Sequence, residues 1–285
     1  MSLKKILKSF SSFYTKVSLL SKIKHLNISG SGKDNIGLYV FLKDGIKFYG
    51  KPTRKKLYKY YSLLIPKYKK IFKVEYLQII FDIIIRYVER GLKLGGPQKE
   101  IFYTPKKGDV VAEMGAYMGY YTLYLSQLVG EKGRIIAIEP MPDNLEFLKN
   151  NIEKNNIKNV TIVPKGVWNE AGELTFYKNK DDNQSGSLLL KNNNKDKIEI
   201  PVDSLDNILD KARVNDVDFM IIQLNGVEYE ALQGLTKIRP KNLAIAARYD
   251  KDHIKTSEKI KQLLEQRNYT VTIVKQDYVF AKLNN

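Results

Sequence analysis

Hydrophobic and polar positions in the second half of the chain alternate in a way that predicts strands and helices in turn. Short apolar runs typical of buried strands are separated by longer segments whose apolar residues recur at helical spacing. Such alternation implies right-handed crossovers and a parallel sheet covered by helices on both faces. The predicted strands are 109–114, 134–138, 160–163, 219–224 and 243–247, and the predicted helices are 120–129, 143–155, 227–237 and 257–267.

The end of the chain predicts a different connection. Strands 270–274 and 278–282 are separated by only three residues, which is too short for a crossover and therefore predicts an antiparallel hairpin. The predicted fold class is α/β, with a Rossmann-like, seven-stranded, mostly parallel sheet whose last strand is antiparallel. Segments 172–177 and 198–202 are possible further strands around a polar loop at 179–197, which we expect on the substrate side.

The first hundred residues have their own pattern. Apolar residues recur at helical spacing between Leu3 and Leu20, with lysines mostly elsewhere on the helix. This helix could lie on an anionic membrane surface, but packing as a cap on the domain is the commoner arrangement. Segments 38–42 and 46–49 flank an Asp-Gly turn and predict a hairpin, and 74–90 predicts a helix.

Positive charge is concentrated in this N-terminal part. The net charge of the chain is +17; residues 1–100 hold 22 Lys and Arg against 6 Asp and Glu, and residues 101–285 hold 26 against 25. We therefore expect a basic N-terminal extension, 1–100, acting as a lid or substrate cradle, and a ligand-binding domain, 101–285. Residues 1–73 could contact an acidic substrate or an anionic membrane. Cations and aromatics alternate at 51–73, but nucleic acid is an unlikely partner because a solvated face is the commoner outcome.

Composition excludes several classes of chemistry. The chain has no cysteine, which rules out thiolate catalysis and disulfides, and its two histidines make a metal site unexpected. The N-terminal apolar stretch is interrupted by lysines, unlike a secretory signal, and no apolar run reaches the length of a membrane span. We expect a cytoplasmic protein, with peripheral membrane contact as the alternative.

A glycine loop follows the first strand of the alternating region. The strand ends in Glu113, and the loop from Gly115 to Gly119 opens a helix. Glycines allow a loop to pass close to a bound ligand at the carboxyl edge of a sheet. The carboxylate suits the ammonium and sulfonium charges of S-adenosylmethionine, whereas a pyrophosphate would be repelled, and dinucleotide loops have a tighter glycine spacing. The loop favours methyl transfer over hydride transfer.

A second acid, Glu139, ends the next strand and is followed by Pro140. A carboxylate at this edge could accept hydrogen bonds from both hydroxyls of a ribose. The alternative is an acid that only caps the next helix. For that cap Asp143 is the better candidate, because Glu146 three residues later completes a capping box.

Three blocks of the sequence, at 108–122, 138–144 and 225–234, resemble the FkbM family of S-adenosylmethionine-dependent methyltransferases. The resemblance covers roughly 108–250 and implies a class I methyltransferase fold and methylation of hydroxyl oxygens on sugars, polyketides or related small molecules. It implies that the loop at 113–122 holds the methionine end of the cofactor, Glu139 the ribose, and 165–167 the adenine. The implied cofactor-binding residues are Glu113, Gly115, Ala116, Tyr117, Gly119, Tyr120, Tyr121, Thr122, Glu139, Pro140, Asn144, Gly166, Val167 and Gln223.

The third block departs from the family pattern, Lys-x-Asp-x-Glu-Gly-x-Glu. Its first three polar positions are Ile221, Gln223 and Asn225 here. Amides can form hydrogen bonds but cannot act as a base. Two other residues are candidate bases: Glu228, which could instead be a first-turn acid favoured by the helix dipole, and His253, which could instead be an exposed loop histidine.

The function expected from these features is O-methylation of a hydroxyl on a sugar, glycan, lipid-linked or other small-molecule acceptor. One alternative is a scaffold of the same fold that binds the cofactor without catalysis, for which the altered block is the main support. Another is an RNA methyltransferase. Residues 223–226 lack the Asn/Asp-Pro-Pro-aromatic block usual for methylation of base amines, although ribose methylation would not need it.

Overall fold

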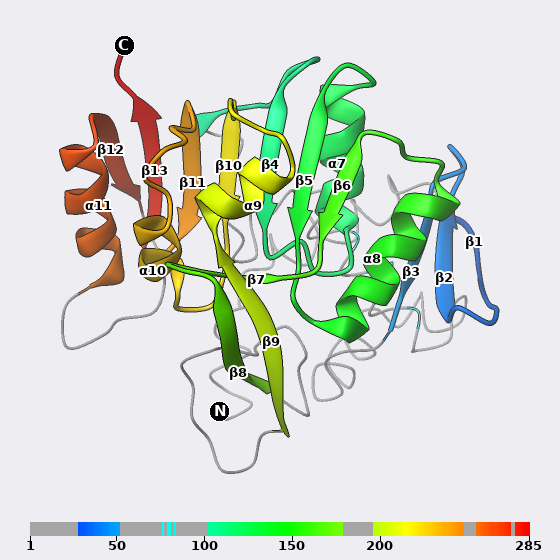
Figure 1. Ribbon diagram of the computed structural model, residues 1–285. Coiled ribbons are helices and arrows are strands. Elements are labelled where there is room, and N and C mark those ends of the chain that lie inside the picture. Colours follow the sequence, from blue (N-terminus) through cyan, green and yellow to red (C-terminus); the bar gives the residue numbers. More distant parts are fainter. Residues whose placement is uncertain are drawn as a thin grey trace, which may run out of the picture.

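A computed structural model gives the structure of the protein (Figure 1). Several predictions lie wholly or almost wholly outside the residues that it describes: the helix near the N-terminus, the basic segment at 51–73, the polar loop at 179–197 and the candidate base His253. The described residues are 28–51, 76, 79, 80, 83, 102–178, 196–247, 255–274 and 277–285.

A seven-stranded sheet forms the centre of the molecule, with the strand order β12-β13-β11-β10-β4-β5-β6 (Figure 1). The strands from β11 to β6 are parallel, and β13 is antiparallel to both of its neighbours. The predicted fold class, with its antiparallel last strand, is therefore confirmed. The strands are β4 (Val110–Met114), β5 (Arg134–Ile138), β6 (Val160–Val163), β10 (Phe219–Ile222), β11 (Asn242–Ala246), β12 (Tyr269–Val274) and β13 (Tyr278–Leu283).

Helices cover both faces of this sheet. Alternate side chains of each strand face opposite ways, so that Val111 and Phe219 pack with α7 and α8, whereas Ala112 and Met220 pack with α9, α10 and α11. Burial on both faces explains why the strands are almost entirely apolar. The helices are α7 (Tyr120–Val129), α8 (Pro142–Lys154), α9 (Leu205–Lys211), α10 (Glu228–Gln233) and α11 (Thr256–Gln266).

Two predicted boundaries near the end of β10 were wrong. The strand ends at Ile222, because the N–H of Leu224 donates to the Glu228 carboxylate instead of continuing the ladder. The helix that follows ends at Gln233 instead of residue 237. Beyond it, the buried Asp206 carboxylate accepts hydrogen bonds from the N–H groups of residues 236, 237 and 238, which turns the chain out of the helix.

A smaller sheet lies beside the carboxyl edge of the central one. It contains β7 (Gly166–Trp168), β8 (Gly172–Lys178) and β9 (Asp196–Ser204) in the order β7-β9-β8. The β8 and β9 strands form an antiparallel pair that extends away from the central sheet (Figure 1). The possible strands at 172–177 and 198–202 are thereby confirmed, whereas β7 was not predicted.

A third sheet is formed by the N-terminal residues: β1 (Ile28–Lys33), β2 (Leu38–Leu42) and β3 (Lys47–Gly50). The predicted hairpin is confirmed as β2 and β3. The β1 strand was missed because Gly30 and Gly32 suggest a loop. In the structure the rings of Phe41 and Tyr39 occupy the space beside these glycines, where a Cβ atom would clash with them.

The N-terminal sheet packs closely on the rest of the molecule. The side chains of Val40 and Phe48 are fully buried in the same cluster as those of α7 and α8. Four described positions of the predicted helix at 74–90 are helical and buried in that cluster: Tyr76, Ile79, Ile80 and Ile83. The change in charge near residue 100 thus does not coincide with a gap in the packing, and the division into two units stays a prediction.

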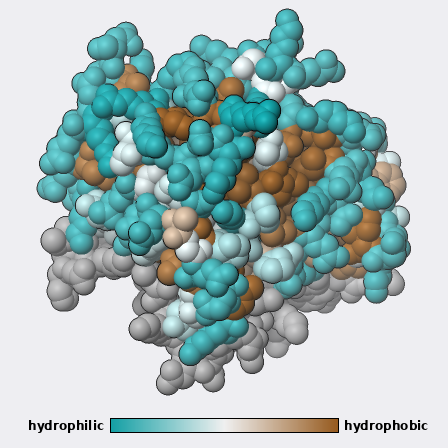
Figure 2. All heavy atoms as spheres, viewed as in Figure 1, coloured by the Kyte–Doolittle hydropathy of each residue, from teal (hydrophilic) through white to brown (hydrophobic). Residues whose placement is uncertain are grey.

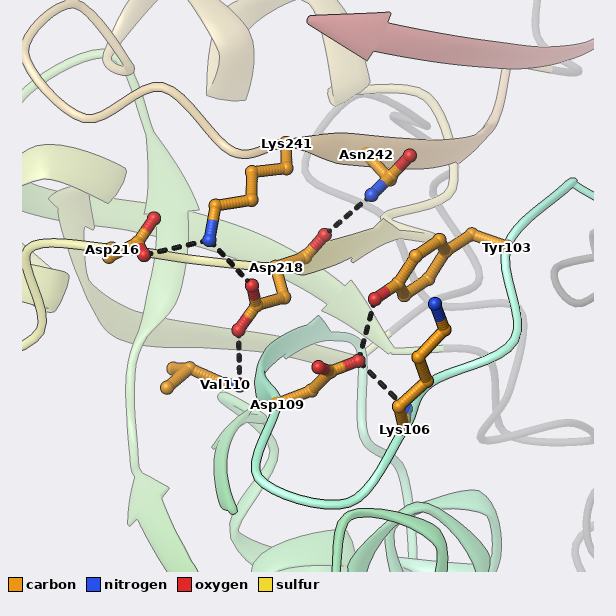
Figure 3. Close-up of polar contacts among 8 residues, drawn as sticks. All are labelled: Tyr103, Lys106, Asp109, Val110, Asp216, Asp218, Lys241 and Asn242. Atoms are coloured by element: carbon orange, nitrogen blue, oxygen red, sulfur yellow. Dashed lines mark hydrogen bonds and ion pairs between the residues drawn. The ribbon is translucent and has the colours of Figure 1, made fainter.

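Polar residues connect the strands at the amino edge of the central sheet (Figure 3). Lys241 Nζ lies 2.9 Å from Asp216 and 2.8 Å from Asp218, and the Asp218 carboxylate also accepts a hydrogen bond from Val110 N–H at 2.9 Å. The Tyr103 hydroxyl donates to the Asp109 carboxylate at 2.7 Å. These contacts tie together the starts of β4, β10 and β11, which is the edge opposite the one where ligands bind in such sheets.

Seen from the side shown in Figure 1, the surface is hydrophilic over most of its area, and hydrophobic residues gather toward the centre of the view (Figure 2). Among the described residues, no helix combines the length and the apolar character needed to cross a bilayer.

Candidate functional site

A pocket lies at the carboxyl edge of β4, β5 and β10, where ligands of parallel sheets are usually found. Its empty volume is about 760 Å³, including the open mouth. Residues from the glycine loop, from the segment after β5, from β7 and from the segment after β10 contribute to its wall. The lining residues are Gly115, Tyr117, Ile138, Glu139, Pro140, Met141, Asn144, Lys165, Gly166, Val167, Phe176, Ile200, Gln223, Leu224, Asn225 and Val227.

The glycine loop is held in a single shape by its backbone. Gly115 has a φ of 85°, and a Cβ atom there would clash with the carbonyl oxygen of Gln223. Gly119 has a φ of 80°, and a Cβ atom there would meet the side chain of Leu148. Tyr117 has a φ of 56°, which is unusual for a residue with a side chain. The glycines are therefore required by the packing of the loop against the protein itself.

Glu139 connects this loop to the segment after β5. Its carboxylate accepts hydrogen bonds from Tyr117 N–H at 2.9 Å, from Met141 N–H at 3.1 Å and from Asn144 Nδ2 at 3.1 Å. The side chain is buried yet borders the pocket. Its hydrogen bond with Tyr117 helps to hold the left-handed backbone there.

The predicted capping box at Asp143 was wrong. The α8 helix begins at Pro142 with Met141 as its N-cap, and no side chain caps it. Glu139 takes the N–H of Met141 instead. Asp143 lies in the first turn and forms an ion pair with Lys51 of the N-terminal part, at 2.9 Å.

Glu113 lies beneath the loop, on the α7 side of the sheet. Its carboxylate accepts a hydrogen bond from Thr122 Oγ1 at 2.7 Å, and the side chain is 3% exposed. Glu113 does not line the pocket, whereas Glu139 does. Five other predicted residues are likewise not among the lining residues: Ala116, Gly119, Tyr120, Tyr121 and Thr122.

The other predicted cofactor residues come together at the pocket. They are Gly115, Tyr117, Glu139, Pro140, Asn144, Gly166, Val167 and Gln223. The prediction missed Phe176 and Ile200, which reach the pocket from β8 and β9. The alternation of apolar residues in these strands was a signal for a buried face, but not for which cavity that face would meet.

One polar atom at the pocket indicates what the site can hold. Nδ2 of Asn144 donates to Glu139, which fixes the orientation of the amide. Its Oδ1 atom is buried and has no hydrogen-bond partner among the described residues. Buried polar atoms normally have partners. An acceptor atom beside a fixed carboxylate therefore fits a ligand that carries hydroxyl groups, such as the ribose of S-adenosylmethionine.

Glu228 holds the turn after β10 and does not line the pocket. It is completely buried, and its carboxylate accepts hydrogen bonds from Leu224 N–H at 3.0 Å and from Gly226 N–H at 2.9 Å. Burial raises the pKa of Glu228 to about 7, although the backbone hydrogen bonds act in the opposite direction. These bonds support a turn in which Asn225 and Gly226 both have positive φ angles.

Part of the chain is similar in sequence to known methyltransferases. A tRNA (cytosine(72)-C(5))-methyltransferase of Pyrococcus horikoshii is 39% identical over 59 residues, which are 21% of this chain and 15% of that protein. A protein-L-isoaspartate O-methyltransferase of Methanococcoides burtonii is 32% identical over 57 residues, 20% of this chain and 28% of that protein. The chain thus matches less than a third of the length of either relative.

Among solved structures, a SAM-dependent methyltransferase from Aquifex aeolicus aligns with a TM-score of 0.39 and 18% identity, covering 70% of this chain and 94% of that one. A family model, the methyltransferase FkbM domain, matches residues 109–271, which is more than half of the chain. This chain therefore belongs to the FkbM methyltransferase family, whose cofactor is S-adenosylmethionine.

Proposed function

We propose that the protein transfers a methyl group from S-adenosylmethionine to a hydroxyl oxygen of a sugar, a glycan, a lipid-linked sugar or another small molecule. The observation that carries the proposal is the composition of the pocket wall. Glu139 lines one part of the wall, and Gln223 and Asn225, two residues with amide side chains, line another part after β10. Amides both donate and accept hydrogen bonds and so suit a neutral hydroxyl group.

The protein has two tasks in such a reaction. Bound S-adenosylmethionine supplies a methyl group that is already activated by the sulfonium. The residues of the chain hold the acceptor oxygen in place and remove its proton. Gln223 and Asn225 serve the first task in this proposal, since neither can take up a proton.

The two candidate bases differ in what supports them. The carboxylate of Glu228 is engaged with the N–H groups of Leu224 and Gly226, so we assign it a positioning role for the turn that carries Asn225. His253, a few residues after β11, remains our candidate for the base, because the end of that strand also lies at the carboxyl edge of the sheet.

The basic N-terminal part suggests which acceptors to test. Residues 1–73 contain 18 Lys and Arg against 2 Asp and no Glu. This excess of positive charge favours an acceptor that carries phosphate or other negative groups, or one presented at an anionic membrane. Lipid-linked sugars combine both properties and belong in the first panel of acceptors.

The decisive experiment measures the transfer of labelled methyl groups from S-adenosylmethionine. Acceptors are tested in four fractions: free and polymeric sugars, lipid-linked sugars, proteins and total RNA. Label in either sugar fraction supports the proposal, and Glu139→Ala should abolish it. Label only in RNA or only in protein would replace it with an activity like those named for the two relatives. Binding of the cofactor without transfer to any fraction would favour a non-catalytic scaffold.

A further inference from the structure

The sequence contains asparagine followed by glycine at one place only, the turn after β10. Asn225 has a φ of 59° and Gly226 a φ of 110°, so both hold a left-handed backbone. Asn225 lines the pocket and is half-buried, which leaves it within reach of solvent. This pair of residues therefore joins an unusual backbone to an accessible side-chain amide.

An asparagine that precedes glycine is prone to attack by the backbone nitrogen of the next residue. The nitrogen bonds to Cγ of the asparagine, an imide ring closes, and the side-chain amide leaves as ammonia. Water then opens the ring and leaves an acid where the amide was. Glycine favours the attack because it has no Cβ atom to crowd the nitrogen. A base that takes the proton of the attacking nitrogen accelerates the step.

Glu228 provides a base at that nitrogen. Its Oε2 accepts the hydrogen bond from Gly226 N–H at 2.9 Å, which is the contact distance of a general base. Burial and the charge of Glu230 raise the pKa of Glu228 to about 7, although the backbone hydrogen bonds act in the opposite direction. The ionised and protonated forms are therefore both present near neutral pH. The turn places a proton acceptor on the N–H whose removal starts the reaction.

Another asparagine in the left-handed conformation lacks this arrangement. Asn156 has a φ of 55° and is exposed, but it is followed by isoleucine. The N–H of Ile157 donates to the backbone carbonyl of Ile152 at 3.1 Å, and a carbonyl accepts a hydrogen bond without taking up the proton. Asn156 is more exposed than Asn225, so access to water does not distinguish the two in favour of Asn225. The following glycine and the carboxylate do.

We propose that Asn225 is a site of self-modification, converted to aspartate or isoaspartate with Glu228 as the base. Glu228 takes the proton of the Gly226 nitrogen as this nitrogen bonds to Cγ of Asn225. The Cγ–Nδ2 bond breaks, and the proton leaves with the ammonia. Water opens the imide at Cγ to give aspartate, or at the main-chain carbonyl to give isoaspartate. One water enters and one ammonia leaves.

The conversion adds a carboxylate to the pocket wall. The FkbM pattern has glutamate at this position, where the chain has Asn225. Neither Gln223 nor Asn225 can take up a proton from an acceptor hydroxyl, whereas the new carboxylate can. This consequence for catalysis rests on the proposed function, but the conversion itself does not.

Mass spectrometry of the freshly purified full chain, incubated at neutral pH in water enriched in heavy oxygen, tests the conversion. The peptide that contains Asn225 should acquire an acid with one heavy oxygen, and the peptide that contains Asn156 should not. Glu228→Gln is the matched variant, because its amide still accepts the hydrogen bond from Gly226 but cannot take up a proton. It should slow the conversion by about a hundredfold.

Two comparisons separate a base from a group that only holds the turn. Glu228→Ala removes both the hydrogen bond and the base, and it should be as slow as Glu228→Gln. The wild-type chain unfolded in urea also loses the contact with Glu228, so it should convert more slowly than the folded chain. This second comparison does not depend on whether either variant folds. Faster conversion in Glu228→Ala or in urea would overturn the inference, since the hydrogen bond would then protect the turn.

Two further results would also overturn it. An unchanged amide at Asn225 in the folded chain would remove the site, and wild-type rates in Glu228→Gln would remove the base. Asn225→Asp tests the consequence for catalysis, and it should transfer methyl groups at least about tenfold faster than freshly purified wild-type protein. Equal or slower transfer would refute that consequence alone. Absence of transfer from both proteins would overturn the proposed function, while the mass measurement would still decide the conversion.

Discussion

Asn151 of α8 is the side chain through which the N-terminal sheet and the glycine loop are joined. It is completely buried, and its Nδ2 donates to the carbonyl oxygens of Tyr49 at 3.0 Å and Met118 at 2.7 Å. Its Oδ1 accepts a hydrogen bond from Tyr49 N–H at 2.6 Å. Met118 lies within the loop, so one amide contacts both the edge of β3 and the backbone that shapes the pocket.

The cost of removing this amide can be estimated from the groups that it leaves behind. In Asn151→Ala, the N–H of Tyr49 and the carbonyl of Met118 lose these hydrogen bonds, while the carbonyl of Tyr49 keeps the one from Tyr120 Oη at 2.9 Å. A buried backbone group without a partner costs about 1–3 kcal/mol. Two such groups give a loss of about 2–6 kcal/mol in the free energy of unfolding.

Urea denaturation at neutral pH measures this loss, and the neighbouring residue provides the control. Asn150 is half-buried, and its Nδ2 donates to the carbonyl of Glu146, one turn earlier in the same helix, in an exposed hydrogen bond of 2.8 Å. Asn150→Ala should change the stability by less than about 0.5 kcal/mol. Asn151→Ala should also weaken the binding of S-adenosylhomocysteine, because the glycine loop loses the hydrogen bond at Met118. Equal stability of the two variants would refute the reasoning that the sheet is tied to the loop through this residue.

Three further predictions follow from individual contacts. Hydrogen bonds from three backbone N–H groups outweigh the burial of Asp206 and lower its pKa. The stability that this carboxylate contributes is therefore present above its ordinary pKa of 3.8 and is lost as the pH falls below that value. Asp206→Asn should flatten the acid limb of a plot of the free energy of unfolding against pH. The pKa of Glu228 shifts in the opposite direction, from 4.5 up to about 7. The free energy of unfolding should therefore fall as the pH rises from 4.5 to about 7, and Glu228→Gln should remove this pH dependence. Asp218→Ala should lower the free energy of unfolding by about 1–3 kcal/mol, because the N–H of Val110 loses its acceptor. Lys241→Met removes only partly exposed ion pairs and should lower it by less than about 1 kcal/mol in the same urea assay. If residues 1–73 contact anionic surfaces, co-sedimentation with phosphatidylserine vesicles should be strong at low salt and fall at high salt, and equal binding to neutral vesicles would contradict this.

Periodicity in the sequence was sufficient for the central sheet, because its strands and helices are local patterns. The bounds of α7, β5 and β6 agree with the prediction residue for residue. The elements that were missed depend on partners far away in the chain. The β7 strand has only three residues and exists through its pairing with Val202 in β9, and β1 depends on aromatic rings from β2 that cover its glycines.

The candidate site divides in the same way. Glu139 could be predicted because its position after a strand fixes its location at the carboxyl edge. Phe176 and Ile200 could not, because their place in the wall depends on how the small sheet folds back over the pocket, which no local pattern encodes. Gln223 and Asn225 were noticed as departures from the family, but only the structure shows both of them at the pocket.

The arrangement of polar groups suggests that the pocket is shaped before any ligand binds. Glu139 holds Tyr117 of the glycine loop, Glu228 holds the turn that carries Asn225, and Asn151 holds the loop at Met118. Each of these bonds fixes backbone, so less ordering has to accompany binding. Substitutions of these residues should therefore lower stability and cofactor affinity together. Phe176 contributes to the wall without holding a loop, so its substitution should lower affinity while the free energy of unfolding changes little. The two groups of variants would separate the residues that build the pocket from those that select its ligand.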